Sequence, residues 1–401
     1  MPSHSLSSSS SHTTTYLLFF VLGAVGALTP LAIDMYLPAM PNLARDLGVA
    51  EGSVQITLTV YTAGFAIGQL IQGPLADSYG RRPVLIIGVA LFAVASVMSA
   101  LAEGIDALIL IRGIQGFAGA AAAVIIQAIV RDMFDREDFS RAMSFITLVI
   151  TIAPLIAPLL GGYIAIWFGW RGIFWVLAVF SLIVIALVLW KIPETLKEEN
   201  RQPLHLVSIL KHYASLCRNP VVVGLIFSGA FSFAGMFSFL TAGSFVYINI
   251  YHVEPNEFGY LFALNIIAMI IMTMINGRFV KKIGSHAMLK LALSIQLFAG
   301  VGLFVGWILD LGLWGTVPFV VLFVGTTATI GSNTMALLLS GYPTMAGTVS
   351  SLAGTLRFGT GSVMGGTIAF MPDGVVWPMI SVMTTCSILS TTCYWIFGRK
   401  A

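Results

Sequence analysis

The sequence predicts an all-α integral membrane protein with twelve transmembrane helices arranged as two six-helix halves. Three observations lead to this fold class. Of the 401 residues, 58% are hydrophobic and only 9% are charged, whereas soluble domains carry roughly a quarter charged residues. Apolar runs follow one another from Tyr16 to Phe397, and each is near the roughly 20 residues that span a bilayer. The runs are continuously apolar, unlike the alternating strands of a membrane β-barrel.

The expected helices are the apolar runs that charges or turn residues bound. Their ranges are 16–39, 53–76, 83–102, 107–130, 141–165, 171–190, 220–250, 256–277, 286–308, 314–340, 346–370 and 376–398. A soluble bundle would need a polar outer shell, which no segment supplies. The connection 191–219 is long and charged, and it is expected to be a cytoplasmic linker between an N-terminal half, 16–190, and a C-terminal half, 220–398.

The tail and the loop charges predict how the chain lies in the membrane. Residues 1–15 are rich in Ser and Thr and contain no Lys or Arg, which argues against a signal peptide and favours a disordered cytoplasmic tail. With both termini on one side, sixteen Lys and Arg residues fall on that side, and only Arg45 and Arg171 fall on the other. Short cytoplasmic loops retain positive charge, so we expect both termini in the cytoplasm.

Composition also limits the partners. The net charge of +3 is scattered between apolar runs, which excludes a nucleic-acid-binding surface. We expect no metal or cofactor, because the chain shows no ligand cluster and no phosphate-binding glycine loop. The three cysteines lack metal-ligand or disulfide-framework spacing and are expected to fill space: Cys217, Cys386 and Cys393.

Ionisable residues within the spans are the strongest functional signal, because charge is costly in hydrocarbon and usually marks a pathway. Asp34 is the acidic residue that we place inside a span, and Arg112 lies at a matching depth in the fourth helix. Burial disfavours an ionised carboxylate, and a nearby cation favours it. We therefore expect Asp34 to bind the proton and Arg112 to adjust the proton affinity of its carboxylate. The alternatives are an interfacial Asp34 and an Arg112 that only bonds helix carbonyls.

The connection after the second helix carries a turn motif, Gly73-Pro-Leu-Ala-Asp77-Ser-Tyr-Gly80-Arg81-Arg82. Its glycines allow a tight turn, and Asp77 can form charge-assisted bonds with the Arg pair. We expect these bonds to stabilise one conformation and to break in another. The alternative is a plain turn with positive charges. A weaker copy, Gly277 to Gly284, follows the eighth helix.

The fifth helix contains Pro154, Pro158, Gly161 and Gly162. Proline inside a membrane helix frees a carbonyl and can bend the axis. A glycine pair lets another helix approach closely. We expect these residues to act mechanically in a conformational change, with a purely structural kink as the alternative.

Candidate substrate contacts come from the seventh helix and from isolated polar groups. An aromatic stripe is usually packing, but aromatic walls also suit an apolar ligand. The expected contacts are Phe233 and Phe237 together with Tyr36, Asn265 and Arg357. Arg357 lies near the middle of the eleventh helix without an acidic partner in any span, so substrate contact and packing between helices are equally open for it.

These segments together resemble a known family. The turn motif is similar to the signature loop of the major facilitator superfamily, and Ala157-Pro158-Leu-Leu-Gly161-Gly162 resembles its antiporter motif, with Ala157 in place of Gly. Arg112-Gly-Ile-Gln-Gly116 resembles the motif of its fourth helix. The segments Ile33–Pro41, Arg131–Phe134, Ser232–Phe239 and Ala346–Phe358 look like the bicyclomycin-resistance family of drug:proton antiporters.

The resemblance implies a monomer in the bacterial inner membrane that exports drugs in exchange for protons. Bicyclomycin, sulfonamides and amphenicols are the implied substrates. A proton-coupled symporter or exporter of a small metabolite is the alternative; a symporter would share the fold and the turn motif, but the motif of the fifth helix is not expected in it. No nucleophile–base constellation indicates an enzyme.

Overall fold

A computed structural model describes residues 8–134, 136–201, 213–342 and 345–400. Every regular element within these ranges is helical. In chain order the elements are α1 Ser8–Asp34, η1 Leu37–Ala39, α2 Met40–Leu47, α3 Glu51–Tyr79, α4 Arg81–Ala100, α5 Ile105–Met133, α6 Arg136–Lys191, η2 Glu198–Asn200, α8 Pro220–Ser244, η3 Phe245–Ile250, α9 Pro255–Ile308, α10 Gly312–Gly341, α11 Ala346–Ala369, α12 Trp377–Ile396 and η5 Gly398–Lys400.

The twelve expected spans are all present. Nine helices of the described part are long and apolar enough to cross a membrane. Two of them, α6 and α9, each contain two spans, because the backbone turns at Gly169 (φ 69°) and Gly284 (φ 83°). Both residues occupy the left-handed region that favours glycine. The more polar α11 completes the set, so the prediction of twelve helices is confirmed.

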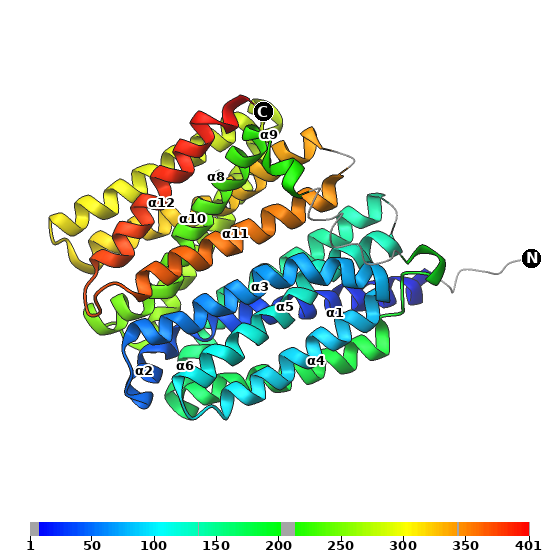
Figure 1. Cartoon of the computed structure of the whole chain (residues 1–401), viewed down its shortest axis with the longest axis horizontal. Helices are drawn as coiled ribbons and strands as arrows, with labels where there is room; N and C mark the ends of the chain where they lie inside the picture. Colours follow the sequence, from blue (N-terminus) through cyan, green and yellow to red (C-terminus); the bar gives the residue numbers. More distant parts are fainter. Residues whose placement is uncertain (1–7, 135, 202–212, 343–344, 401) are drawn as a thin grey trace, which may run out of the picture.

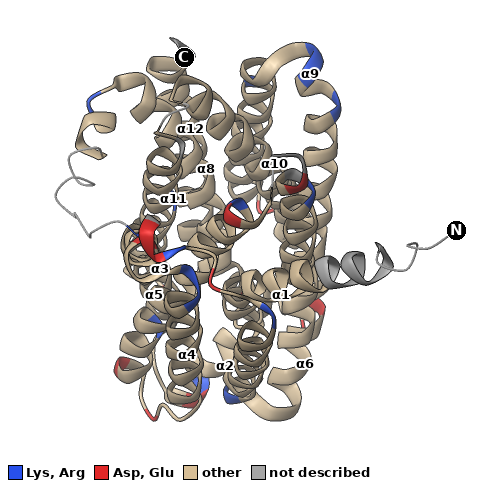
Figure 2. Cartoon of the chain, turned by 90° about the vertical axis from the view of Figure 1, so that its right-hand side faces the viewer, with Lys and Arg blue, Asp and Glu red and all other residues tan. Residues whose placement is uncertain are grey.

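The chain forms two bundles that lie side by side (Figure 1). Helices α1 to α6 form the first, and α8 to α12 form the second. The ribbons of the two bundles lie close together at one end and diverge toward the end where both chain termini lie. We call these ends the opposite end and the terminal end. Seen from the terminal end, charged residues gather in connections and at helix ends (Figure 2).

The outer surface of the bundles is apolar, as a lipid environment requires. Large hydrophobic side chains point outward along several helices, including Leu110, Phe298 and Trp167, which is 69% exposed. Exposed apolar surface on this scale is unusual for a soluble monomer. Many Ser and Thr hydroxyls inside the bundles donate to a carbonyl of the preceding helical turn, as Ser181 does to Leu177 at 2.6 Å, which satisfies them without water.

The first helix differs from the prediction at both ends. Residues 1–7 lie outside the described part, and α1 begins at Ser8, within the segment 1–15 that was predicted to be a disordered tail; the disorder of this tail stays a prediction. At its other end α1 stops at Asp34, and η1 and α2 continue the span to Leu47. Pro38 and Pro41 lack the N–H that a continuous helix needs. Asp34 therefore lies near the middle of the span Leu17–Leu47, deeper than in the expected helix 16–39.

Candidate functional site

Asp34 sits where the first transmembrane span changes from α-helix to a short 3₁₀ segment. It is 6% exposed, and it forms no ion pair among the described residues. Met35 and Tyr36 follow it in a turn, and the N–H of Met35 still donates to the carbonyl of Leu31 at 3.1 Å. The break thus places a carboxylate deep in the span beside irregular backbone, an arrangement typical of ion-binding sites in transporters.

Arg112 lies on α5 and binds the backbone of α1 next to Asp34. Its guanidinium donates to the carbonyl of Ala32 at 3.2 Å and to Oε1 of Gln115 at 2.6 Å. Gln115 in turn donates to the hydroxyl of Ser96 at 2.8 Å. Among the described residues Arg112 and Asp34 form no ion pair, so the alternative role, a structural donor to a helix carbonyl, is present in this conformation.

Three aromatic rings surround the Arg112 guanidinium, those of Tyr36, Tyr61 and Phe174. We call this arrangement the Arg112 cage. Its central carbon lies 4.3 Å from the ring centre of Tyr61, 4.9 Å from that of Tyr36 and 5.7 Å from that of Phe174. Desolvated cation–π contacts of this kind stabilise a buried cation. Tyr36 is fully buried and its hydroxyl bonds the hydroxyl of Thr57 at 2.8 Å. Tyr36 therefore lies against Arg112 in this structure, and its predicted contact with substrate stays a prediction.

The proline and glycine motif of the fifth span lies against this break. Pro154 and Pro158 lie within α6. A Cβ atom added to Gly161 would overlap the carbonyl oxygen of Met35, and one added to Gly162 would come within 2.7 Å of the carbonyl oxygen of Pro255 on α9. The motif thus contacts the Asp34 break on one side and the second bundle on the other.

Three aromatic rings, Phe65, Phe233 and Phe358, join the bundles near Arg357. Together with Arg357 we call them the Arg357 cluster. The Arg357 guanidinium lies 4.5 Å from the ring centre of Phe233, and its Nε has no hydrogen-bond partner within the described part of the chain. Phe233 packs on Phe358 at 4.8 Å, and Phe358 packs on Phe65 of the first bundle at 4.5 Å. The prediction identified Arg357 and Phe233 but missed the two rings that complete the cluster.

Of the other two predicted contacts, Phe237 borders this cluster and Asn265 does not: the Phe237 ring stacks on Phe233 with the ring centres 6.2 Å apart. Phe237 is fully buried and packs against α11, where Gly365 leaves room for its ring. Asn265 on α9 is 1% exposed, and its Oδ1 has no partner among the residues that the structure describes. No described contact joins Asn265 to the Arg357 cluster or to the Arg112 cage.

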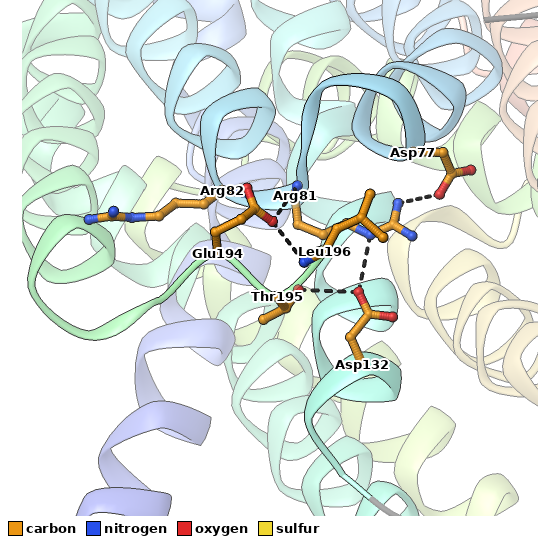
Figure 3. A network of polar contacts seen from close by, with 7 residues as sticks. All are labelled: Asp77, Arg81, Arg82, Asp132, Glu194, Thr195 and Leu196. Carbon is orange, nitrogen blue, oxygen red and sulfur yellow. Dashed lines mark hydrogen bonds and ion pairs between the residues drawn. The ribbon is translucent and has the colours of Figure 1, made fainter. Parts of the chain in front are cut away.

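The turn motif forms a charged network at the terminal end of the first bundle (Figure 3). Arg81 pairs with Asp77 at 2.5 Å and with Asp132 of α5 at 3.3 Å. Glu194, just beyond α6, accepts the backbone N–H groups of Arg81 and Arg82 at 3.0 and 3.3 Å. The network therefore ties the ends of α3, α4, α5 and α6 together within one bundle.

The roles of Asp132 and Glu194 were not predicted, although Asp132 lies in the segment Arg131–Phe134 and Glu194 in the connection 191–219. Thr195 donates to Asp132 at 3.1 Å, and the N–H of Leu196 donates to Glu194 at 2.9 Å. Gly80 has φ 106°, and a Cβ there would overlap the Glu194 carboxylate. Gly73 lies on α3 with only Val124 at 3.4 Å from an added Cβ, so the close approach occurs at Gly80.

Comparisons with known proteins agree with this architecture. The family model of the Major Facilitator Superfamily matches residues 18–366. The chain is 42% identical to the bicyclomycin resistance protein homolog of Haemophilus influenzae, over 96% of this chain and 97% of that protein. It is 30% identical to a chloramphenicol resistance protein of Pseudomonas aeruginosa, over 93% of this chain and 89% of that protein.

Solved structures with the same fold are more distant in sequence. The crystal structure of a D-xylose-proton symporter superimposes with a TM-score of 0.75 at 16% identity, and the match covers 95% of this chain and 97% of that chain. A likeness at this identity establishes the shared fold and leaves the substrate open.

Proposed function

The chain belongs to the Major Facilitator Superfamily, and from that premise we propose that it exports small drug molecules in exchange for protons. Its relatives at 42% and 30% identity are named for resistance to bicyclomycin and chloramphenicol, which supports the export of drugs of this size. The observation that carries the proton half of the proposal is Asp34, a carboxylate buried within the first span beside the break in α1.

Asp34 suits a proton carrier because its protonation depends on its surroundings. In the present arrangement it is buried without an ion pair among the described residues, so the neutral form is favoured. Gly161 of α6 packs on the adjacent carbonyl of Met35. A movement of α6 against α1 would therefore change the hydration of Asp34 and its distance from Arg112. Hydration favours the ionised carboxylate, and the proton leaves.

The Arg357 cluster is the proposed substrate region. Phe65, Phe233 and Phe358 supply apolar walls from both bundles, and the unpartnered Nε of Arg357 supplies a donor. Ligand sites commonly combine aromatic walls with a few polar groups in this way. A drug with carbonyl, hydroxyl or nitro groups would satisfy the Arg357 donor, while its apolar body contacts the rings.

We place the protein in the bacterial inner membrane with the terminal end in the cytoplasm, following the positive charges of its loops. On this placement the bundles are joined at the outward side and diverge inward. The halves 16–190 and 220–398 would move as units of a monomer, with the network of Asp77, Arg81 and Glu194 keeping the first half rigid.

The test is transport in inside-out membrane vesicles with an imposed proton gradient. With an acidic lumen, the vesicles are expected to accumulate radiolabelled chloramphenicol or bicyclomycin, and dissipation of the gradient should abolish the accumulation. Accumulation that requires an acidic exterior would indicate symport. Movement of either drug that does not respond to the gradient would refute proton coupling.

A further inference from the structure

The two halves meet at the opposite end through a small group of polar residues. This junction cluster consists of Glu51 and Gln55 on α3, Asn249 on η3, and Asp373 between α11 and α12. Nδ2 of Asn249 donates to Oε1 of Glu51 at 2.6 Å. The backbone N–H of Glu51 donates to Oδ2 of Asp373 at 3.1 Å. Both bonds join the first half to the second.

A small cavity lies among these residues. Its volume is about 20 Å³, and Glu51, Gln55 and Asp373 are among its lining residues. Gln55 is 5% exposed, and its Oε1 has no hydrogen-bond partner in the described part of the chain. An unpaired buried oxygen is costly, and the cavity exceeds the roughly 10–15 Å³ that one water molecule needs. The site therefore fits a proton donor, either a water molecule or a protonated carboxyl.

The electrostatics of the cluster favour a proton on Glu51. Glu51 is half-buried and is exposed to the negative charge of Asp373. The other groups that face Glu51 are neutral: the amides of Gln55 and Asn249 and the backbone N–H of Gly374. Among the described residues no Lys, Arg or His pairs with Glu51. Partial burial and a nearby negative charge both disfavour the ionised form of Glu51.

We propose that Glu51, beside the negative charge of Asp373, is a second proton-binding site, which holds a proton while the halves are joined at the opposite end. The proposal rests on the proposed function in one respect, that the halves alternate between two arrangements. Protonation removes the repulsion across the junction and keeps this end closed. Loss of the proton leaves two like charges on opposite halves and favours separation. The carboxylates lie at the rim, where protons from the solvent reach them.

The backbone beside the cluster makes the contact close. A Cβ atom added to Gly52 would overlap the carbonyl oxygen of Ala369 at the end of α11. The first turn of α3 therefore rests directly on the second half, next to Glu51. A larger side chain at Gly52 would separate the halves without changing any charge, and so provides a control for the distance measurement.

The experiment measures the distance between the halves by electron paramagnetic resonance of the full chain in lipid nanodiscs. Spin labels on Gly104→Cys and Leu309→Cys report it, since both positions lie in exposed connections of the opposite end. The native Cys217, Cys386 and Cys393 are replaced by serine. Spectra are compared between about pH 4.5 and about pH 8, a range that covers a carboxyl group whose ionisation is disfavoured by burial and a nearby negative charge. Gly52→Leu should give the long distance at both pH values and so calibrates the labels.

We expect the long-distance population to rise with pH, with roughly a three- to ten-fold change in the ratio of the two populations, as for a single like-charge pair near a surface. Glu51→Gln and Asp373→Asn keep the hydrogen-bond acceptors and should stay at the short distance. Asp106→Asn, at an exposed carboxylate of the same end, should keep the shift of the parent protein.

A parent protein without a pH-dependent distance, or a shift that survives in both Glu51→Gln and Asp373→Asn, would overturn the proposal. The measurement does not depend on transport. If Asp34→Asn transports normally while the distance still follows Glu51, the proposed role of Asp34 fails and the junction site stands.

Discussion

Gly161 of α6 packs directly on Met35, the residue that follows Asp34, and a Cβ atom at Gly161 would overlap the Met35 carbonyl oxygen. This contact gives the antiporter-like motif a physical connection to the carboxylate. The neighbouring Gly162 contacts Pro255 of the second half. One helical segment therefore touches both the residue that follows the proposed proton carrier and the second bundle.

Gly161→Ala is expected to impair transport through this contact. The added methyl must push α6 away from α1, and overpacking of this kind costs about 1–3 kcal/mol. We expect the thermal unfolding temperature in detergent to fall and gradient-driven drug accumulation to drop at least about ten-fold. Gly277→Ala is the matched control, because nothing lies within 4 Å of an added Cβ at that helical position. Equal transport by both variants would contradict the mechanical role.

The Arg112 cage predicts a stability effect at Gln115. Gln115→Leu removes the acceptor of a fully buried guanidinium, and a buried donor left unsatisfied costs about 1–3 kcal/mol. The free energy of unfolding should fall by that amount in a thermal or denaturant titration. Ser96→Ala removes only the partner of the Gln115 amide and should cost less. A smaller loss for Gln115→Leu than for Ser96→Ala would contradict this arrangement.

The network of the turn motif predicts that Glu194 matters more than Asp77. Glu194 accepts three backbone N–H groups, whereas Asp77 is 48% exposed and Arg81 keeps Asp132 as a second partner. We expect Glu194→Ala to lower the free energy of unfolding by about 1–3 kcal/mol and Asp77→Ala by less than about 1 kcal/mol. Thermal unfolding of the two variants side by side decides the order.

Substitutions at Arg357 and Phe237 should distinguish an effect on substrate binding from an effect on packing. Loss of a hydrogen bond to a charged donor costs about 1.5–3 kcal/mol, so Arg357→Gln should raise the Kd for chloramphenicol about ten-fold or more. Phe237→Ala should instead lower the free energy of unfolding by about 3 kcal/mol, and it should change the Kd less than Arg357→Gln does, because Phe237 stacks behind Phe233. Calorimetry of detergent-purified variants measures both; an unchanged Kd for Arg357→Gln would remove it from the substrate region.

The spans were predictable because each is a nearly uninterrupted apolar run, and hydrocarbon leaves the backbone little choice but helix. The break after Asp34 was not predicted: the expected helix 16–39 runs through Pro38, and where α1 ends depends on packing against α5 and α6. Gly169 and Gly284 turn the chain between spans with almost no loop, which composition alone does not specify.

The site was predicted in part. Arg112, Phe233 and Arg357 stood out because charge or aromatic rings are conspicuous in an apolar run. Phe65 did not, since it is an ordinary residue that gains a role only through contacts between helices. Gln115 and Phe358 lay in segments that resemble the family, but their contacts with Arg112 and Phe233 were not predicted. Glu194 and Glu51 lie at helix ends, where acidic residues are common, and their partners are more than a hundred residues away in the chain.

The most direct test of the account compares Asp34→Asn with the parent protein in reconstituted vesicles, with and without a proton gradient. Asparagine resembles the protonated carboxyl, so the variant should fold and should exchange radiolabelled drug across the membrane when no gradient is present. It should fail to accumulate drug when the lumen is acidified, whereas the parent protein accumulates it. Gradient-driven accumulation by Asp34→Asn at the level of the parent protein would contradict the assignment of Asp34 as the proton carrier.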